Sequence, residues 1–173
     1  MITTGPRTLS DGTVTLREVR DDDAKDLYEW RMDPRTRAMF HSTAAVPYET
    51  HLRFVEAYFR PENDDAWFVV ETDGLAVGTI VLYNIARDGR EAEWGRFVIA
   101  PHARGRGLGK KALALLIGYA DGRGIRRLRC DVLASNTGAR LMYRELGFVE
   151  TGQRVIGGRT FVEMLRDEQA GAG

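Results

Sequence analysis

The stretch from Phe97 to Ala120 restricts the fold of this chain more than any other. An apolar run, Phe97 to Ala100, predicts a buried strand that Pro101 ends. A short basic loop follows, and between Leu108 and Ala120 apolar residues recur on one helical face. A strand, a glycine loop and a helix in this order aim free backbone N–H groups at an anion.

Glycines and basic residues alternate in that loop. Its residues are Arg104, Gly105, Arg106, Gly107, Leu108 and Gly109. Glycines let the backbone turn sharply and approach a ligand without a Cβ atom in the way. Lys110 and Lys111 add positive charge where a helix start usually has Asp or Glu, and no acid stands beside them. The loop therefore predicts a phosphate site, with a glycine-rich turn and solvated basic side chains as the alternative.

Two other phosphate loops are excluded by their own requirements. A Walker loop ends in Gly-Lys-Ser or Gly-Lys-Thr, whereas Gly109-Lys110 is followed by Lys111. A dinucleotide-binding fold places its glycines after the first strand, with an acid about 20 residues further on. Here the glycines follow a late strand, and no acid after Gly109 fits that position.

Two motifs in the correct order resemble the Gcn5-related N-acetyltransferase (GNAT) superfamily. The loop from Arg104 to Gly109 is similar to its acetyl-CoA signature: Gln or Arg, two residues, Gly, one residue, Gly or Ala. The segment from Asn136 to Phe148 is similar to the second motif of the superfamily. The resemblance covers roughly residues 12–166. It implies an acetyl-CoA-dependent N-acetyltransferase with a GNAT fold, in which two central parallel strands splay apart and the pantetheine arm enters the gap.

Size and composition fit one domain of this kind. With 173 residues and 43% hydrophobic residues, the chain has room for one sizeable core. We expect a flexible tail at residues 1–11, a single domain at 12–166 and a frayed end at 167–173. Basic and acidic residues number 25 each, so no overall positive charge indicates a nucleic-acid partner.

The remaining compositional features favour a cytoplasmic enzyme. The first residues lack a signal-peptide pattern, and the apolar run within residues 112–120 is too short to span a bilayer. Cys130 is the single cysteine and is expected to be a buried apolar side chain, with a catalytic thiol as the alternative. We expect no metal and no membrane partner, while a homodimer stays open.

The hydrophobic pattern predicts an α/β (α+β) architecture, with a mixed, mostly antiparallel sheet and helices on both faces. Strands are expected at residues 13–19, 66–72, 76–85, 91–100, 125–133, 148–155 and 160–165, and helices at 21–31, 35–40, 48–59, 108–120 and after Ser135-Asn136. Asp73-Gly74 and Gly157-Gly158 indicate hairpin turns. The helix at 108–120 is the crossover that allows two strands to be parallel.

The resemblance also implies catalytic residues. Glu93 stands on the strand before the loop and is the leading general base, acting directly or through water on an amine that is mostly protonated at pH 7. A solvent-facing strand residue is the alternative, and Glu91 and His102 are weaker candidates. Tyr143 corresponds to a tyrosine that protonates the leaving thiolate in many relatives, although its place on an apolar face also permits a packing role.

For the cofactor, the resemblance implies contacts along one strand and its loop. The backbone of Phe97, Val98 and Ile99 is expected to pair with the pantetheine amides like an added strand, and one N–H to polarise the thioester carbonyl. The phosphate contacts are expected from Arg104, Gly105, Arg106, Gly107, Leu108, Gly109 and Lys110. Asn136 is expected to hydrogen-bond the pantetheine arm, although helix capping alone also explains an Asn there.

The acceptor amine is the least constrained part. Residues 16–37 resemble a branch that contains both protein N-terminal acetyltransferases, such as those of ribosomal proteins, and small-amine acetyltransferases. The segments at 39–54 and 92–95 look more like members that acetylate amino sugars linked to nucleotides. We therefore expect a small-molecule amine acceptor. The alternatives are a ribosomal-protein type N-terminal acetyltransferase and a non-catalytic acyl-CoA sensor.

Overall fold

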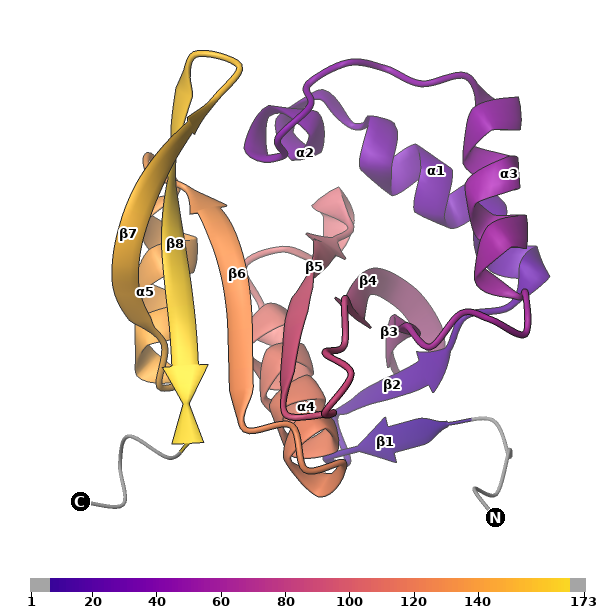
Figure 1. Ribbon diagram of the computed structural model, residues 1–173. Coiled ribbons are helices and arrows are strands. Elements are labelled where there is room, and N and C mark those ends of the chain that lie inside the picture. The colour runs from indigo at the N-terminus through magenta and orange to yellow at the C-terminus, as the bar shows by residue number, and fades with distance from the viewer. Residues whose placement is uncertain (1–6, 169–173) are drawn as a thin grey trace.

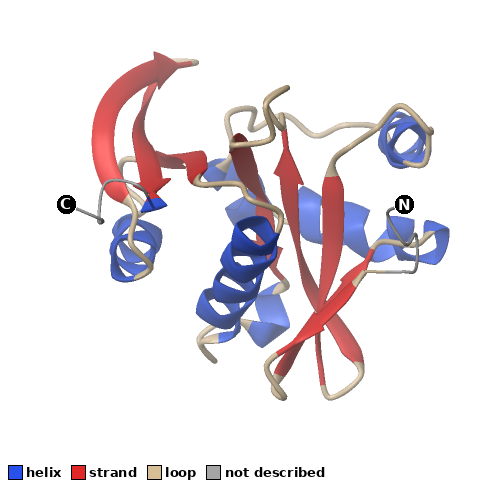
Figure 2. Cartoon of the chain, turned by 60° about the horizontal axis from the view of Figure 1, so that its bottom comes forward, coloured by secondary structure: helices blue, strands red, loops and turns tan. Residues whose placement is uncertain are grey.

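The computed structural model describes residues 7–168, which form one eight-stranded sheet with helices on both faces (Figures 1 and 2). The strands are β1 Thr8–Ser10, β2 Val14–Glu18, β3 Ala66–Thr72, β4 Leu75–Tyr83, β5 Glu91–Ile99, β6 Arg127–Leu133, β7 Val149–Ile156 and β8 Arg159–Asp167. The helices are α1 Ala24–Met32, α2 Pro34–Met39, α3 Tyr48–Tyr58, α4 Leu108–Gly122 and α5 Thr137–Glu145, with 3-10 turns at Asp21–Asp23 and Pro101–Ala103.

Strand order explains how the chain brings its two motifs together. The order across the sheet is β1-β2-β3-β4-β5-β6-β8-β7, and β5 with β6 is the parallel pair among otherwise antiparallel neighbours within residues 7–168. Helix α4 connects β5 to β6, as a parallel pair requires. The predicted mixed, mostly antiparallel sheet is therefore confirmed.

Two cores fill the spaces between the sheet and its helices. One packs α4 and the buried face of α5 against the sheet, with Leu113, Leu116 and Trp94 nearly inaccessible. The other packs α1 and α3 against the opposite face, around Leu27 and Val69. Burying a side chain of this size stabilises the fold by about 1.5–3 kcal/mol. The two layers hold β5 rigidly at the centre of the molecule.

Both predicted chain ends need correction. Thr8–Ser10 is not part of a tail but pairs with β2 as strand β1, for example Leu9 opposite Leu16. Asp167 is not frayed, because β8 continues to it and places it opposite Arg127. Both segments are ordered by backbone hydrogen bonds to a neighbouring strand. A few residues at the end of a chain show too little hydrophobic pattern for the sequence to indicate such pairing. Residues 1–6 and 169–173 lie outside the described residues. No helix within residues 7–168 has the length and apolar character to cross a membrane.

Candidate active site

The centre of the sheet opens between its two parallel strands. The strands β5 and β6 pair only from Glu91 to Glu93, although β5 continues to Ile99 and β6 to Leu133. Figure 1 shows the two strands diverging toward the top of the view. The predicted splay is thus present. Beyond Glu93 the β6-facing edge of β5 has no ladder partner, so its backbone groups are available to an extended ligand.

A bulge interrupts β5 beside this opening. Arg96 has a φ of 47°, which is uncommon for a residue with a side chain, and the register with β4 shifts between Thr79 and Val81. Gly78 on β4 is required here, because a Cβ on it would lie 2.4 Å from the carbonyl oxygen of Val98. The bulge was not predicted, although Gly95 beside it, a glycine inside a strand, is a signal that could have indicated one.

The glycine loop leads from β5 into α4 in the geometry that an anion site needs. Gly105 and Gly107 have φ values of 76° and 73°, which favour glycine, and Gly107 is the N-cap of α4. No side chain caps the first N–H groups of α4, so they stay available to a ligand. A Cβ on Gly105 or Gly107 would meet no atom within 4 Å, whereas one on Gly109 would lie 3.2 Å from the Phe97 ring. The first two glycines shape the loop, and the third lets α4 approach β5.

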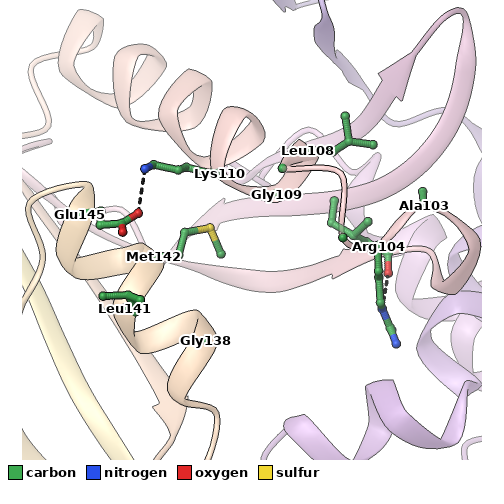
Figure 3. Close-up of a pocket in the computed structure, with 12 residues that line it drawn as sticks. Ala103, Arg104, Leu108, Gly109, Lys110, Gly138, Leu141, Met142 and Glu145 are labelled. Carbon is green, nitrogen blue, oxygen red and sulfur yellow. Dashed lines mark hydrogen bonds and ion pairs between the residues drawn. The ribbon is translucent and has the colours of Figure 1, made fainter.

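The basic side chains around this loop are less free than the sequence indicates. Arg104 turns away from the loop and donates from Nε to the Ile99 carbonyl at 3.0 Å (Figure 3). It also donates from Nη2 to Thr36 Oγ1 at 2.8 Å. Lys110 Nζ lies 2.7 Å from Glu145 Oε2. The expectation that no acid compensates the helix start is therefore wrong, because α5 supplies one from a distant part of the sequence. The side chain of Arg104 braces α2.

A cavity of about 360 Å³ joins the two sequence motifs. Figure 3 shows it between the loop and α5, with Leu108 and Gly109 on one side and Gly138 and Met142 on the other. Of the residues expected at the cofactor, Ile99, Arg104, Gly105, Gly107, Leu108, Gly109 and Lys110 line this cavity. Arg106 does not line it.

A second, larger cavity of about 730 Å³ lies beside the opened strands. Glu93, Phe97 and Val98 of β5 line it, together with Asn136 and Tyr143 from the second motif. The structure thus brings both expected catalytic residues to one space. The two cavities meet along β5: Phe97 and Val98 line the larger one, and the next residue, Ile99, lines the smaller one.

Glu93 is half-buried, and Arg129 and Arg154 act on its charge without forming an ion pair with it. Within residues 7–168 its carboxylate makes no hydrogen bond and no ion pair. Burial raises the pKa of the Tyr83 phenol, and the negative charge of Glu93 raises it further. The two weaker candidates lie elsewhere. Glu91 is held by Arg127 at 3.0 Å and by Arg129, outside the cavity, and His102 is exposed and lines another surface depression.

Tyr143 is packed by aromatic rings and keeps its hydroxyl free of protein partners. The side chain is 8% exposed, and its ring lies edge-on against Trp94 with centroids 4.9 Å apart. Within the described chain its hydroxyl makes no hydrogen bond. Burial raises the pKa of Tyr143 well above its usual value, so the phenol stays protonated at neutral pH. Packing and proton donation are compatible in this arrangement.

Asn136 caps helix α5 at the edge of the larger cavity. Its Oδ1 accepts a hydrogen bond from the Ala139 N–H at 3.3 Å. The capping role is present, and the amide NH₂ group has no protein partner within residues 7–168. Cys130 of β6 is buried beside Tyr143, and burial raises the pKa of its thiol, which argues against a catalytic thiolate.

Comparison with known proteins shows the family to which this chain belongs. The model of the acetyltransferase (GNAT) family matches residues 24–148. The chain belongs to this family. An uncharacterized N-acetyltransferase of Methanocaldococcus jannaschii is similar to the chain, with 31% identity over 149 residues covering 80% of this chain and 62% of that protein. The chain therefore spans less than two thirds of that relative's length.

Solved structures share the GNAT fold over nearly the whole chain. A spermidine N-acetyltransferase from Vibrio cholerae in complex with CoA and spermine has a TM-score of 0.83 at 20% identity, covering 92% of this chain and 98% of that one. RimL, a ribosomal L7/L12 alpha-N-protein acetyltransferase in complex with coenzyme A, has a TM-score of 0.80 at 15% identity, covering 95% and 99%. At these identities the likeness shows the fold. Family and fold agree with the predicted class of acetyl-CoA-dependent N-acetyltransferase.

Proposed function

We propose that this GNAT protein transfers the acetyl group of acetyl-CoA to a primary amine of a small molecule, by direct attack in a ternary complex. The observation that supports this best is the free edge of β5, which connects the glycine-loop cavity to the cavity that contains Glu93. A coenzyme held at the loop can reach along that edge to the carboxylate. A cytoplasmic setting, in which the Cys130 thiol stays reduced, is part of the proposal.

The chain's own groups supply what acetyl transfer needs. The N–H groups of α4 and the loop bind the phosphates, and the edge of Phe97–Ile99 pairs with the pantetheine amides. One of these N–H groups polarises the thioester carbonyl. Glu93 removes the proton of the amine, directly or through water, and Tyr143 donates to the leaving thiolate. Holding both reactants in one space supplies the rest of the rate enhancement.

For the acceptor, we propose an amino sugar or a nucleotide-linked amino sugar. The charges of the larger cavity do not favour a polyamine, because a polycation needs an excess of acids. Three acids line the cavity, Glu93, Asp131 and Glu163, together with four arginines, Arg31, Arg96, Arg129 and Arg154. Asp131 and Glu163 already lie beside Arg154, so few carboxylates are left for a polycation. This balance suits a polar acceptor with fewer positive charges.

An amine panel tests the proposal. The purified protein is incubated with acetyl-CoA and amino-sugar nucleotides, amino sugars, peptides with free N-termini, polyamines and aminoglycosides, and both thiol release and acetylated product are measured. We expect the highest kcat/KM with an amino sugar or its nucleotide. Preference for a peptide would instead indicate an N-terminal acetyltransferase, and preference for a polyamine would contradict the charge argument. Tight acetyl-CoA binding without turnover on any amine would indicate a sensor.

A further inference from the structure

Arg31, which lines the larger cavity, and Arg37 near it have no acid to neutralise them among the described residues. Arg31 of α1 donates to the Ser42 carbonyl at 3.2 Å, and its guanidinium lies 4.1 Å from the centre of the Phe40 ring. Arg37 of α2 donates to the Thr43 carbonyl at 3.4 Å. Neither has a carboxylate partner within residues 7–168. Adjacent like charges destabilise the folded chain unless an anion offsets them.

Both guanidinium groups also keep a donor unused. Arg31 Nη1 and Arg37 Nε are buried nitrogens with no hydrogen-bond partner among the described residues. A buried donor without an acceptor is costly. Burial and the nearby charge of Arg37 lower the pKa of Arg31, which confirms that no acid compensates it. If the Arg31 side chain turned toward a ligand in the cavity, it would therefore lose only its hydrogen bond to Ser42 and its contact with the Phe40 ring.

The other arginines of the cavity are all neutralised. Arg129 is paired with Glu91, Arg154 with Asp131, and Arg96 with Asp65 at 3.8 Å. Arg31 is thus the cavity arginine without an acid partner in the described chain.

Among the acids that line the cavity, Glu93 is the one that has no ion-pair partner in the described chain, as Arg31 is among the arginines. Asp131 lies 3.2 Å from His41 Nε2 and also binds Arg154, and Glu163 lies 3.7 Å from the same arginine. Within residues 7–168 Glu93 has no such partner. Among the described residues, the cavity therefore contains one carboxylate without an ion pair, Glu93 on β5, and one guanidinium without an ion pair, Arg31 on α1; Arg129 and Arg154 act on Glu93 only from a longer distance. An acceptor that neutralises both must itself have both charges.

We propose that Arg31, reinforced by the charge of Arg37, is an anion-binding subsite of the acceptor pocket, so that the acceptor is an amine that also carries a carboxylate or phosphate group. This inference rests on the proposed acetyl transfer and narrows its substrate class. The amine lies at Glu93 and the anionic group at Arg31. The planar guanidinium suits either anion because it binds two oxygen atoms at once.

Matched pairs of amines test the subsite. Glucosamine 6-phosphate is compared with glucosamine, and an amino acid with its amide, so that each pair differs in one anionic group and the two pairs distinguish phosphate from carboxylate. The measured quantity is the ratio of kcat/KM for the anionic to the neutral member. We expect a ratio above one for at least one pair in the parent protein. We expect Arg31→Gln to lower that ratio about 10-fold or more, mainly through KM.

Two further variants keep the test decisive. Arg37→Gln should lower the same ratio by a smaller factor, and it replaces Arg31→Gln if that variant does not fold. Arg87→Gln removes an exposed arginine on a turn remote from the cavity and should leave the ratio unchanged. Acetyl transfer with ratios that neither Arg31→Gln nor Arg37→Gln alters would overturn the subsite and leave the proposed function standing. Bound acetyl-CoA without transfer to any of these four amines or to any amine of the wider panel would overturn the proposed function itself.

Discussion

Replacing Glu93 by glutamine should lower kcat/KM by about 10²-fold or more at neutral pH, measured with the best amine of the panel. Glutamine keeps the shape of the site but cannot accept the proton. An aliphatic amine with a pKa of about 10 is almost entirely protonated at pH 7, so the reaction depends on that acceptor. In the structure the carboxylate is half-buried beside the cavity, and within residues 7–168 it makes no hydrogen bond and no ion pair, although Arg129 and Arg154 lie within electrostatic reach.

The pH dependence separates this role from a structural one. Activity of Glu93→Gln should recover partly as the pH rises and free amine accumulates, and an amino sugar, with its lower amine pKa, should suffer less than a lysine-like amine. Glu91→Gln is the matched control, because Glu91 is on the same strand but does not line the cavity, and its carboxylate is bound by Arg127 and Arg129. A pH–rate profile of Glu93→Gln identical to that of the parent would reduce Glu93 to a strand residue.

Tyr143→Phe should lower kcat by about 10²-fold while changing the affinity for acetyl-CoA little. The phenylalanine ring keeps the packing against Trp94 and removes only the hydroxyl that donates to the thiolate. Because burial raises the pKa of Tyr143, the parent should not lose this donor below pH 10.

A second tyrosine provides the control for this experiment. Tyr119→Phe removes a hydroxyl on α4 that accepts from Arg7 at 3.0 Å and Arg123 at 3.1 Å, remote from the cavity, and should leave kcat near the parent value. Steady-state kinetics with calorimetric titration of acetyl-CoA measures both effects. Undiminished turnover of Tyr143→Phe would assign this residue to packing alone.

The sequence predicts most of the elements because their signals are local. The spacing of hydrophobic residues predicts the strands and helices, and the glycine turns and Pro101 indicate where several of them end. The two motifs indicate the loop at which the coenzyme is expected. The splay of β5 and β6 follows only from the family resemblance. The bulge at Arg96 has one local signal, Gly95 inside the strand, which was not used for the prediction.

The side-chain contacts of the site were harder to predict because they join distant segments. Lys110 meets Glu145 and Arg104 meets Thr36 across 35 and 68 positions. The sequence does not mark Arg31 as a candidate binding residue. It is a candidate because, among the described residues, no acid pairs with it in the folded structure. Which charged side chains of the described residues have no ion-pair partner is visible only in the three-dimensional structure.

Hydrogen exchange of backbone amides with and without acetyl-CoA tests the central claim most directly, because it locates the coenzyme on the chain. The account predicts slower exchange on binding in two segments, residues 94–99 at the free edge of β5 and residues 105–110 at the start of α4. Gly107→Val should abolish both effects, while Gly74→Val, which strains a remote turn with a similar φ, should not. Protection confined to other segments, or none at saturating acetyl-CoA, would contradict the account.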